Sequence, residues 1–481
     1  MNIQTNSIRV RFAPSPTGIM HLGNVRTALL NYLFAQQKKG TFILRIEDTD
    51  PDRNFDPNGK QIMEDLNWLG LEYDEGGIKG GPYSPYYQSQ RTTIYQEQLD
   101  ILKTKEVLYR CFCTPEDLER KRARSIALKI APRYDRTCLK LSEQEIQSNL
   151  AHGMLFIWRF KIPENYTATV NDLAHGKIDF DLNHFSDFPV SRSDGTFTFL
   201  FANCIDDMLM KISYVLRGED HLSNTANQIL LYETFEAPTP IFWHLPILCN
   251  VDGKKLSKRD FGFSLNDLKK SGFLPEAINN YLAIIGGGSF AHEIMDMQTL
   301  IQSMNFDHIK PISNIRYDVE KLKWINHKWI QLYDPEKLAL VALPYLEPVY
   351  PQIKNLDYKK LIELIQTIKS ELITLNDVVP MLNFYFEEPL LTKETVLEHI
   401  PTDLQKPMNE LLKSSLAFVD NHDQFLDTLK KEAKTAQINT KLLFTILRLL
   451  LTGSIQGPAV KDILTILGPQ ETQKRLEKFI E

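Results

Sequence analysis

Two short segments, far apart in the chain, carry residues that suit phosphate chemistry. In the first, His21-Leu22-Gly23-Asn24 lies where a proline-rich loop enters a predicted helix, whose free backbone N–H groups and dipole favour an anion. Gly23 would let a nucleotide approach the backbone, and His21 would donate a hydrogen bond to a phosphate oxygen. A histidine at this position also serves as an ordinary helix cap, so the segment needs support from elsewhere in the chain.

The second segment is the basic run of residues 254–259, which follows a glycine turn. On an ordinary surface it would be a solvated loop. As a functional loop, its ammonium groups would meet the negative charge that builds up on a triphosphate, and losing one such stabiliser typically costs ~2.7–4 kcal/mol in the transition state. The chain contains no G-x-x-x-x-G-K-[ST] motif, so we expect any nucleotide to bind without a P-loop.

The elements that position the first segment are predicted to form a βαβ unit. A strand at residues 8–12 leads into a loop that two prolines and a glycine keep out of regular structure. Apolar residues recur at helical spacing over residues 24–38, and a second strand is predicted over residues 42–46. Such a unit implies a parallel sheet that binds ligands at the carboxyl ends of its strands.

The rest of the chain divides into an α/β half and a helical half. Further elements are predicted as helices at 59–69, 91–105 and 224–235 and as strands at 155–162, 197–205 and 213–216. Residues 111–195 are charged and rich in cysteine, and we expect them to form an α+β insertion that does not continue the sheet. After about residue 260 helical patterns dominate, and Gly286-Gly287-Gly288 is the clearest break. The predicted fold class is α/β, a Rossmann-like parallel-sheet domain with an insertion, followed by an all-helical C-terminal region.

Composition limits the classes of protein that this chain can be. Its 481 residues, 43% hydrophobic and 24% charged, predict two to four folded domains and exclude a disordered chain or a minimal binding module. The net charge of −6 excludes a global positive field, so any nucleic-acid surface must be local. Five cysteines fit a reducing compartment. No apolar run reaches ~18 residues, and the first strand begins about seven residues in, so we expect no membrane span, no signal peptide and a cytoplasmic location.

The two phosphate segments together resemble the two signatures of class I aminoacyl-tRNA synthetases. Residues 12–24 are similar to the signature His-Ile-Gly-His, with Asn24 in place of its last histidine, and Lys255-Leu256-Ser257-Lys258-Arg259 is similar to Lys-Met-Ser-Lys-Ser. The surrounding sequence resembles bacterial-type glutamyl-tRNA synthetases at Arg11, at residues 13–18 (Ala-Pro-Ser-Pro-Thr-Gly), 45–50 (Arg-Ile-Glu-Asp-Thr-Asp), 217–221 (Arg-Gly-Glu-Asp-His), 317–324 (Tyr-Asp-Val-Glu-Lys-Leu-Lys-Trp) and 451–454 (Leu-Thr-Gly-Ser). The resemblance therefore spans essentially the whole chain.

The resemblance implies a two-step reaction. ATP, accompanied by Mg²⁺, and L-glutamate form glutamyl-adenylate, and the glutamyl group then passes to the terminal adenosine of tRNA(Glu). His21 and Gly23 would bind ATP, and Lys258 would stabilise the leaving pyrophosphate. The resemblance adds Lys255 to the catalytic groups and places Asp220 and Leu248 in the ATP site.

Glutamate itself presents two carboxylates and one ammonium group. Arginine suits carboxylates because its planar fork donates two parallel hydrogen bonds, and by resemblance Arg11 and Arg217 would serve here. The ammonium group would be held by Glu47, Ser15 and the backbone of Ala13. Where the family commonly has a tyrosine, this chain has Phe199, so one hydroxyl is missing, and nearby Asn203 could contribute a polar group.

Three cysteines in the insertion suit a metal. Cys111 and Cys113 are followed 24 residues later by Cys138, and thiolates suit a tetrahedral zinc site with a fourth ligand, which could be Tyr134 or a water. Some bacterial glutamyl-tRNA synthetases carry zinc at this spacing in the acceptor-binding insertion. Buried cysteines acting as small hydrophobic residues are the alternative.

The resemblance also assigns roles to segments. Residues 1–110 and 196–255 would be the halves of the catalytic domain, 111–195 the acceptor-binding insertion, 256–330 a stem-contact region with the KLSKR loop, and 331–481 the helical anticodon-binding domain. A basic run within the insertion would contact the acceptor end of tRNA, and it comprises Arg120, Lys121, Arg122, Arg124, Lys129 and Arg133.

Three other functions fit parts of the sequence. Glutaminyl-tRNA synthetase shares the catalytic fold, but residues 45–50 and Arg217 favour an acidic substrate. A ligase that adenylylates small molecules would not need so large a helical half. A non-catalytic tRNA-binding paralogue would be expected to have lost His21 or Lys258. We expect a monomer, and the sequence leaves open whether tRNA(Gln) is also charged.

Overall fold

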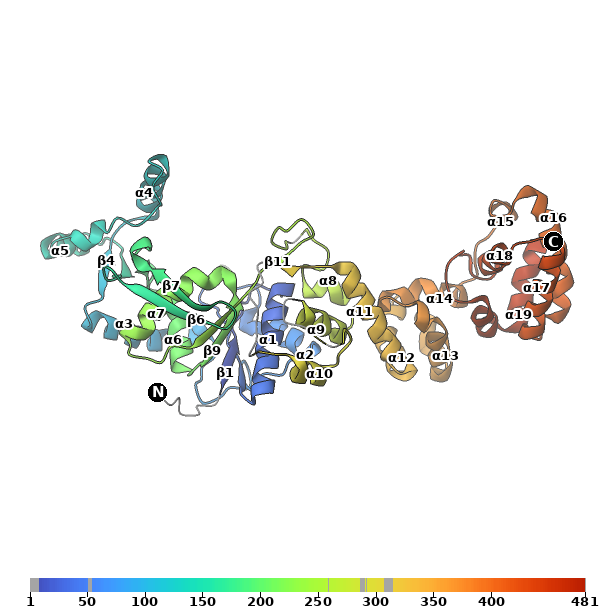
Figure 1. Ribbon diagram of the computed structural model, residues 1–481, viewed down its shortest axis with the longest axis horizontal. Coiled ribbons are helices and arrows are strands. Elements are labelled where there is room, and N and C mark those ends of the chain that lie inside the picture. Colours follow the sequence, from blue (N-terminus) through green and yellow to red (C-terminus); the bar gives the residue numbers. More distant parts are fainter. Residues whose placement is uncertain are drawn as a thin grey trace. The chain divides into compact units, whose positions relative to one another are not determined.

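The computed structural model describes residues 8–50, 54–257, 259–285, 290, 292–306 and 315–480. The predicted catalytic residue Lys258 and the break at Gly286-Gly287-Gly288 lie outside these residues. The chain divides into two compact units, Met1–Leu268 with Ile278–Val319 and Lys269–Ala277 with Glu320–Glu481 (Figure 1). Each unit is described by itself below.

A parallel sheet forms the centre of the first unit. Strands β1 (Arg9–Phe12), β2 (Thr41–Leu44) and β3 (Glu75–Gly76) pair in the order β1-β2-β3, all parallel. Strands β9 (Tyr214–Gly218) and β10 (Ile241–Leu245) also pair in parallel. Ser213 joins the two sets, because its N–H donates to the Arg9 carbonyl at 3.0 Å. Buried residues such as Val10 and Ile43 fill both faces of these strands, as a parallel sheet covered by helices requires.

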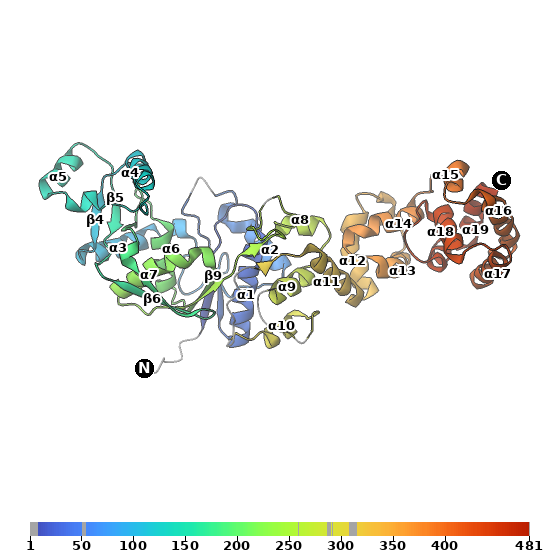
Figure 2. The same cartoon turned by 45° about the horizontal axis from the view of Figure 1, so that its top comes forward.

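Helices cover this sheet and complete the predicted βαβ unit. Helix α1 (Leu22–Lys38) connects β1 with β2. Helix α7 (Leu222–Thr234) packs on strand β6 (Thr167–Asp172) and on helix α6 (Phe199–Leu209), as Figure 2 shows. The other helices of this part of the chain are α2 (Lys60–Trp68), α3 (Thr92–Thr104), α8 (Leu265–Lys270), α9 (Pro275–Ile284) and α10 (Met297–Ser303), and a short parallel pair joins β11 (Leu248–Cys249) to β12 (Ile315–Arg316).

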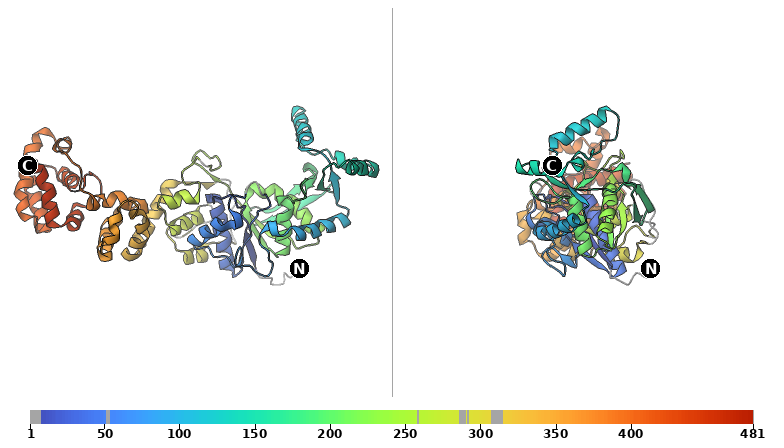
Figure 3. Two further views of the ribbon diagram at one scale, coloured as in Figure 1. Left: turned by 180° about the vertical axis from the view of Figure 1, so that it is seen from behind. Right: turned by 90° about the vertical axis from the view of Figure 1, so that its left-hand side faces the viewer.

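The region predicted as an insertion contains a small antiparallel sheet. Its strands are β4 (Leu108–Cys111), β5 (Ile157–Phe160) and β8 (Phe188–Pro189), and its helices are α4 (Pro115–Ala127) and α5 (Glu143–Ala151). Figures 1 and 3 show α4 and α5, in teal, projecting away from the parallel sheet, and neither helix has a buried residue.

One part of this expectation is wrong, because the region does extend the main sheet. Strand β6 (Thr167–Asp172) pairs in parallel with β10 at Asp172 and Phe242, and β7 (Gly176–Asp181) pairs with β6 in antiparallel fashion. The physical reason is side-chain alternation. Ala168, Val170 and Asp172 all point to the buried face of β6, so this strand has a core side that the sheet can accept.

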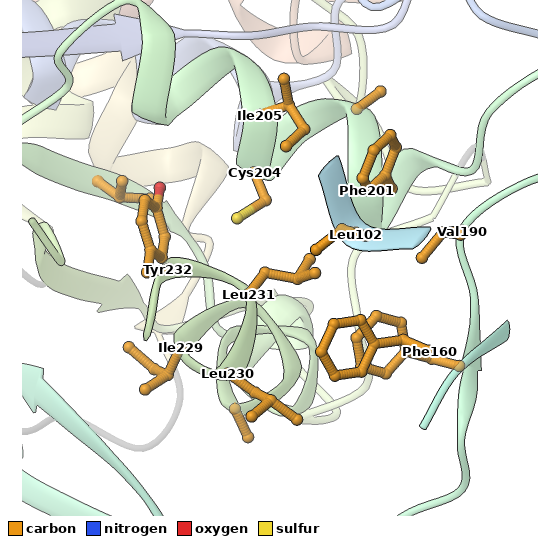
Figure 4. Packing of buried hydrophobic residues seen from close by; sticks show 14 of the residues in the cluster. Leu102, Phe160, Val190, Phe201, Cys204, Ile205, Ile229, Leu230, Leu231 and Tyr232 are labelled. Carbon is orange, nitrogen blue, oxygen red and sulfur yellow. The ribbon is translucent and has the colours of Figure 1, made fainter. Parts of the chain in front are cut away.

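A second expectation is also wrong, because most of residues 197–205, from Phe199 onward, form a helix and not a strand. Alternating phenylalanines suggested a strand, but α6 begins at Phe199 and continues to Leu209. Phe201, Cys204 and Ile205 point from it into a core that also contains residues of α7, such as Leu231 (Figure 4). A short apolar run fits a buried helix as well as a strand, and only its packing decides between them.

The second unit is helical, which confirms the predicted fold class of an α/β half followed by a helical half. It contains α11 (Val319–Leu332), α12 (Pro335–Leu346), α13 (Tyr358–Ile368), α14 (Val378–Phe386), α15 (Lys393–Leu397), α16 (Thr402–Ser415), α17 (His422–Thr435), α18 (Thr440–Thr452) and α19 (Val460–Ile480). Helices α12, α13 and α14 pack on one another, as do α16 to α19. Among the described residues, every helix is too short or too polar to span a lipid bilayer.

Candidate functional site

The two phosphate segments meet at one cavity of about 620 Å³ in the first unit. The cavity lies at the carboxyl ends of β1, β9 and β10, where a parallel sheet of this kind binds its ligands. It is lined by all of the predicted substrate and ATP residues that the structure describes, which are Arg11, Ala13, Ser15, His21, Gly23, Glu47, Phe199, Asn203, Arg217, Asp220, Leu248 and Lys255. Backbone hydrogen bonds hold the segments together, since Leu22 N–H donates to the Phe263 carbonyl at 2.9 Å and Leu265 N–H donates to the Met20 carbonyl at 2.9 Å.

His21 is prepared to donate a hydrogen bond into this cavity. It caps α1, because its Nδ1 accepts from the Asn24 N–H at 3.3 Å. Burial and the nearby charge of Lys255 lower the pKa of His21, so the ring is neutral at pH 7 and its proton lies on Nε2. A Cβ on Gly23 would approach the His21 ring to 3.0 Å, so glycine leaves the ring its space. The start of α1 therefore offers a ring N–H and a helix dipole to an anion.

The basic loop reaches the same cavity from the other side. Strand β11 anchors it, because Leu256 N–H donates to the Leu248 carbonyl at 2.9 Å. The Lys255 ammonium lies 3.2 Å from a carboxylate oxygen of Asp220, which follows β9. The ion pair with Asp220 thus holds the exposed Lys255 at the cavity, where its ammonium group can contact a triphosphate.

Three buried arginines lie at or beside the cavity. Arg11 and Arg217 line it, and Arg11 and Arg45 share the carboxylate of Asp207. Asp207 on α6 accepts from Arg11 Nε at 2.9 Å and from Arg11 Nη2 at 3.1 Å. The same carboxylate accepts from Arg45 Nη1 at 2.7 Å. Burial would raise the pKa of Asp207, but the charges of Arg11 and Arg45 lower it below its usual range. The charge of Asp207 therefore balances Arg11 and shares in balancing Arg45.

The third arginine, Arg217, has a different environment. Its Nη2 donates to Thr225 Oγ1 at 2.5 Å and to Gln228 Oε1 at 2.6 Å, and no carboxylate of the described residues forms an ion pair with it. Its Nε and Nη1 are buried and have no hydrogen-bond partner among the described residues. Burial lowers its pKa to about 10, which leaves it charged at neutral pH. Arg217 can therefore bind an anion that enters the cavity.

The carboxylate of Glu47, a group of the opposite charge type to Arg217, lines the same cavity. Its Oε1 accepts from Asn203 Nδ2 at 2.6 Å and from Arg45 Nη2 at 3.2 Å, and burial raises its pKa.

The ring of His221 packs against Phe199 with 5.2 Å between centroids, and burial together with Arg217 lowers the pKa of His221 to about 4. The rings of Phe199 and His221 therefore form an aromatic and uncharged part of the cavity lining.

The predicted metal ligands also come together, at the edge of the small antiparallel sheet. The sulfur atoms of Cys111, Cys113 and Cys138 all lie within 4.8 Å of one another. Tyr134 Oη lies 3.2 Å from Cys111 Sγ and 3.7 Å from Cys113 Sγ. Zinc bonds of ~2.3 Å to sulfur require ligand separations of this size, so the three thiols could bind zinc with Tyr134 or a water as the fourth ligand.

Sequence reasoning missed the residues that hold the arginines in place. Asp206 and Asp207 are two adjacent acids inside an apolar run, and that contrast was the available signal, since buried carboxylates need partners. Thr225 and Gln228 gave no comparable signal, because polar residues on a helix are ordinary.

The fold and this cavity define a class I aminoacyl-tRNA synthetase. The family model described as "tRNA synthetases class I (E and Q), catalytic domain" matches residues 7–324, and one described as "Anticodon binding domain" matches residues 337–480. A glutamate–tRNA ligase of Finegoldia magna is 37% identical over 490 residues, covering 99% of both chains. That of Bacillus subtilis is 34% identical over 488 residues, covering 98% of this chain and all of the relative.

The solved structures agree with the sequence relatives. A crystal structure of a glutamate–tRNA ligase from Elizabethkingia meningosepticum, in complex with its amino acid, superimposes with a TM-score of 0.85 at 33% identity, over 99% of both chains. The chain belongs to the glutamate–tRNA ligase family. It is a ligase that uses ATP, with Mg²⁺, to activate L-glutamate to glutamyl-adenylate and transfers the glutamyl group to tRNA.

Proposed function

We propose that L-glutamate lies in the cavity with its side-chain carboxylate at Arg217 and its ammonium group at Glu47. Ser15 and the carbonyl of Ala13 complete the ammonium site, and Asn203 holds Glu47 in place through its 2.6 Å hydrogen bond. Arg11 lies close enough to the cavity to contact the α-carboxylate, although Asp207 already balances its charge. The observation that carries this assignment is the charged Arg217, which lines a cavity that Glu47 also lines and has two nitrogens without a partner in the part of the chain that the structure describes.

ATP is proposed to lie against the start of α1, with His21 and Gly23 at its phosphates and ribose and with Asp220 and Leu248 beside it. In this arrangement an α-carboxylate oxygen attacks the α-phosphorus, and the bond to pyrophosphate breaks with its electron pair going to the leaving oxygen. Lys255 and Lys258, the latter outside the described residues, stabilise the charge on the departing pyrophosphate. Magnesium bound to the phosphates of ATP would partly neutralise their charge. The protein supplies positioning and charge, which suffice for such a transfer.

The remaining segments are proposed to bind tRNA(Glu). The insertion, residues 111–195, presents the basic helix α4 for the acceptor end, and residues 256–330 would contact the stem. Residues 331–481 would bind the anticodon loop. The three thiols, when they hold zinc, would fasten β4 to the segment around Cys138 and so stiffen the base of the insertion. We also propose a cytoplasmic monomer, and the five cysteines, all free in the structure, are consistent with a reducing compartment.

The glutamate assignment is tested by Arg217→Gln. Removing the cation should lower kcat/KM for glutamate by about 100-fold or more, because a hydrogen-bonded charge pair is lost in a buried site. The KM for ATP should change little. Arg217→Lys is the matched control for charge, and it should retain part of the activity. Unchanged glutamate kinetics in Arg217→Gln would contradict the assignment.

The choice of tRNA is tested separately. Purified tRNA(Glu) and tRNA(Gln) are charged with labelled glutamate by the full chain, and ATP–pyrophosphate exchange is measured with and without tRNA. We expect charging of tRNA(Glu). Equal charging of tRNA(Gln) would show that the helical unit accepts both anticodons, and gel filtration of the same preparation tests the monomer against the chain mass of 55.6 kDa.

A further inference from the structure

The guanidinium of Arg217 is held in one orientation by two side chains of a single helix face. Thr225 and Gln228 are three residues apart on α7, so they lie on the same side of it. Thr225 Oγ1 accepts from Arg217 Nη2 at 2.5 Å, and Gln228 Oε1 accepts from the same nitrogen at 2.6 Å. Both N–H bonds of Nη2 are thereby used. The three N–H bonds of Nε and Nη1 remain without partners among the described residues, and Arg217 lines the cavity.

Thr225 is itself fixed by a buried chain of hydrogen bonds. Its Oγ1 lies 2.7 Å from His244 Nε2, and His244 Nδ1 lies 2.8 Å from Asp172 Oδ2. Burial would raise the pKa of Asp172, but hydrogen bonds from the His244 ring and backbone lower it well below its usual range, so it is ionised. Burial lowers the pKa of His244, so its ring is neutral.

These protonation states determine which atom donates and which accepts in each of these hydrogen bonds. His244 Nδ1–H donates to Asp172, which leaves Nε2 to accept from the Thr225 hydroxyl. This contact of 2.7 Å is shorter than the 3.2 Å from the same hydroxyl to the His221 carbonyl, the other acceptor within reach. The lone pairs of Thr225 Oγ1 then face Arg217. Thr225 is wholly buried, as is His244, so no water competes for these contacts. The hydroxyl is thus oriented as an acceptor for the arginine.

Gln228 is fixed by a second chain that ends at the ammonium site. Its Nε2 donates to Asn203 Oδ1 at 3.0 Å, and Asn203 Nδ2 donates to Glu47 Oε1 at 2.6 Å. Gln228 and Asn203 are each 2% exposed. A continuous line of hydrogen bonds therefore connects Arg217 with Glu47, the two groups that would hold opposite ends of glutamate.

We propose that Thr225 and Gln228 are positioning residues that select the side-chain carboxylate of glutamate by holding Arg217 through neutral oxygens only. The inference rests on the proposed role of Arg217. Because neither anchor carries charge, the full positive charge of Arg217 is left for the substrate. Arg11 shows the alternative, since its guanidinium is already balanced by Asp207.

The test uses the full chain in tRNA charging with labelled glutamate. Thr225→Val and Gln228→Met keep the approximate shape of each side chain but remove its hydrogen bonds, which are those to Arg217 and to His244 for Thr225 and those to Arg217 and to Asn203 for Gln228. Each should lower kcat/KM for glutamate by about tenfold or more, as expected for a lost hydrogen bond to a charged group, and should leave the KM for ATP unchanged. Thr225→Ser, which keeps the hydroxyl, should retain near-normal kinetics.

A third variant tests the charge argument directly. Gln228→Glu has the shape of the native residue but places a carboxylate on Arg217. It also loses the hydrogen bond from Gln228 Nε2 to Asn203 Oδ1, a loss that Gln228→Met shares, so the comparison of these two variants isolates the charge. Gln228→Glu should lower kcat/KM for glutamate by about 100-fold, whereas inhibition by glutamine, whose side chain is neutral, should change less than threefold. A purely structural role would weaken both ligands equally.

The outcomes separate this inference from the role of Arg217. If Arg217→Gln impairs glutamate use but Gln228→Glu and Thr225→Val do not, the positioning role is wrong and the assignment of Arg217 stands. If Arg217→Gln itself has no effect, the assignment fails first. Thermal unfolding checks that each variant is folded. If the apolar variants do not fold, the isosteric Gln228→Glu decides. Equal losses in the use of glutamate and in inhibition by glutamine would then overturn the inference.

Discussion

Asp207→Asn should be among the most damaging conservative substitutions in the catalytic unit. Asp207 is 2% exposed and accepts three hydrogen bonds from two arginines, Arg11 and Arg45. An asparagine of the same shape has one carbonyl oxygen, and its amide N–H groups would face guanidinium N–H groups. The substitution therefore removes a negative charge and also sets donors against donors.

The expected loss of stability follows from what each arginine retains. Arg45 keeps ion-pair distances of 3.2 Å to Glu47 and 3.6 Å to Asp206, so it stays balanced. Arg11 keeps no carboxylate partner among the described residues. Breaking a buried pair by removing one partner costs ~3–5 kcal/mol. Because only one of the two arginines is left without a carboxylate partner, we expect the free energy of unfolding to fall by an amount near the lower end of this range, about 3 kcal/mol.

The loss should depend on pH in a defined direction. The pKa of Asp207 is lower in the folded protein than its ordinary value, because of Arg11 and Arg45. Its charge therefore stabilises the fold above the unfolded pKa of about 3.9, and this stabilisation disappears as pH falls through the folded pKa. The difference between wild type and Asp207→Asn should be largest near neutral pH and should shrink below about pH 4.

The assay is urea unfolding of the full chain, with circular dichroism and tryptophan fluorescence recorded at several pH values. Asp100→Asn is the matched control, because Asp100 is an exposed carboxylate paired with Lys103 at 2.8 Å on α3. It should cost far less stability than Asp207→Asn, because an exposed ion pair is screened by water. The reasoning would be refuted if the two variants lost equal stability at neutral pH, or if the loss for Asp207→Asn were the same in acid.

Two further predictions concern the insertion. We expect elemental analysis of freshly purified wild type to give about one equivalent of zinc. Cys138→Ser should lose this zinc, whereas Cys204→Ser should keep it, and wild type without zinc would contradict the site. Replacing Arg120, Arg122 and Arg124 by glutamine should weaken tRNA binding in every sequence context. It should also reduce the slope of log affinity against log salt concentration, measured by filter binding. An unchanged slope would exclude α4 from the phosphate contacts.

The parts of the site that sequence could predict are those with local causes. The loop from Ala13 to Gly18 is set by its prolines, and His21 caps α1 because it immediately precedes the first helical residue. Strand β1 and helix α1 follow from short-range apolar spacing. That the two phosphate segments face one cavity was implied by resemblance, since no local pattern brings residue 21 close to residue 255.

The parts that sequence missed depend on partners distant in the chain. Asp207 lies 196 residues from Arg11, and Thr225 lies 19 residues from His244. Helix α6 was predicted as a strand because the alternation of Phe197, Phe199 and Phe201 is compatible with both structures until the neighbouring helix is known. Pairing of β6 with β10 likewise required knowing which face of β6 is buried.

Arginines at the carboxyl ends of the strands have the same chemistry, and the helices behind them decide how each is used. Helix α6 presents Asp207, which balances the charge of Arg11 and makes it part of the framework. Helix α7 presents Thr225 and Gln228, which orient Arg217 without neutralising it. A carboxylate on α7 would make Arg217 resemble Arg11, and the charge of Arg217 would then no longer be available to an acidic side chain. We therefore propose that selection of glutamate depends on Thr225 and Gln228, two neutral residues that act through Arg217.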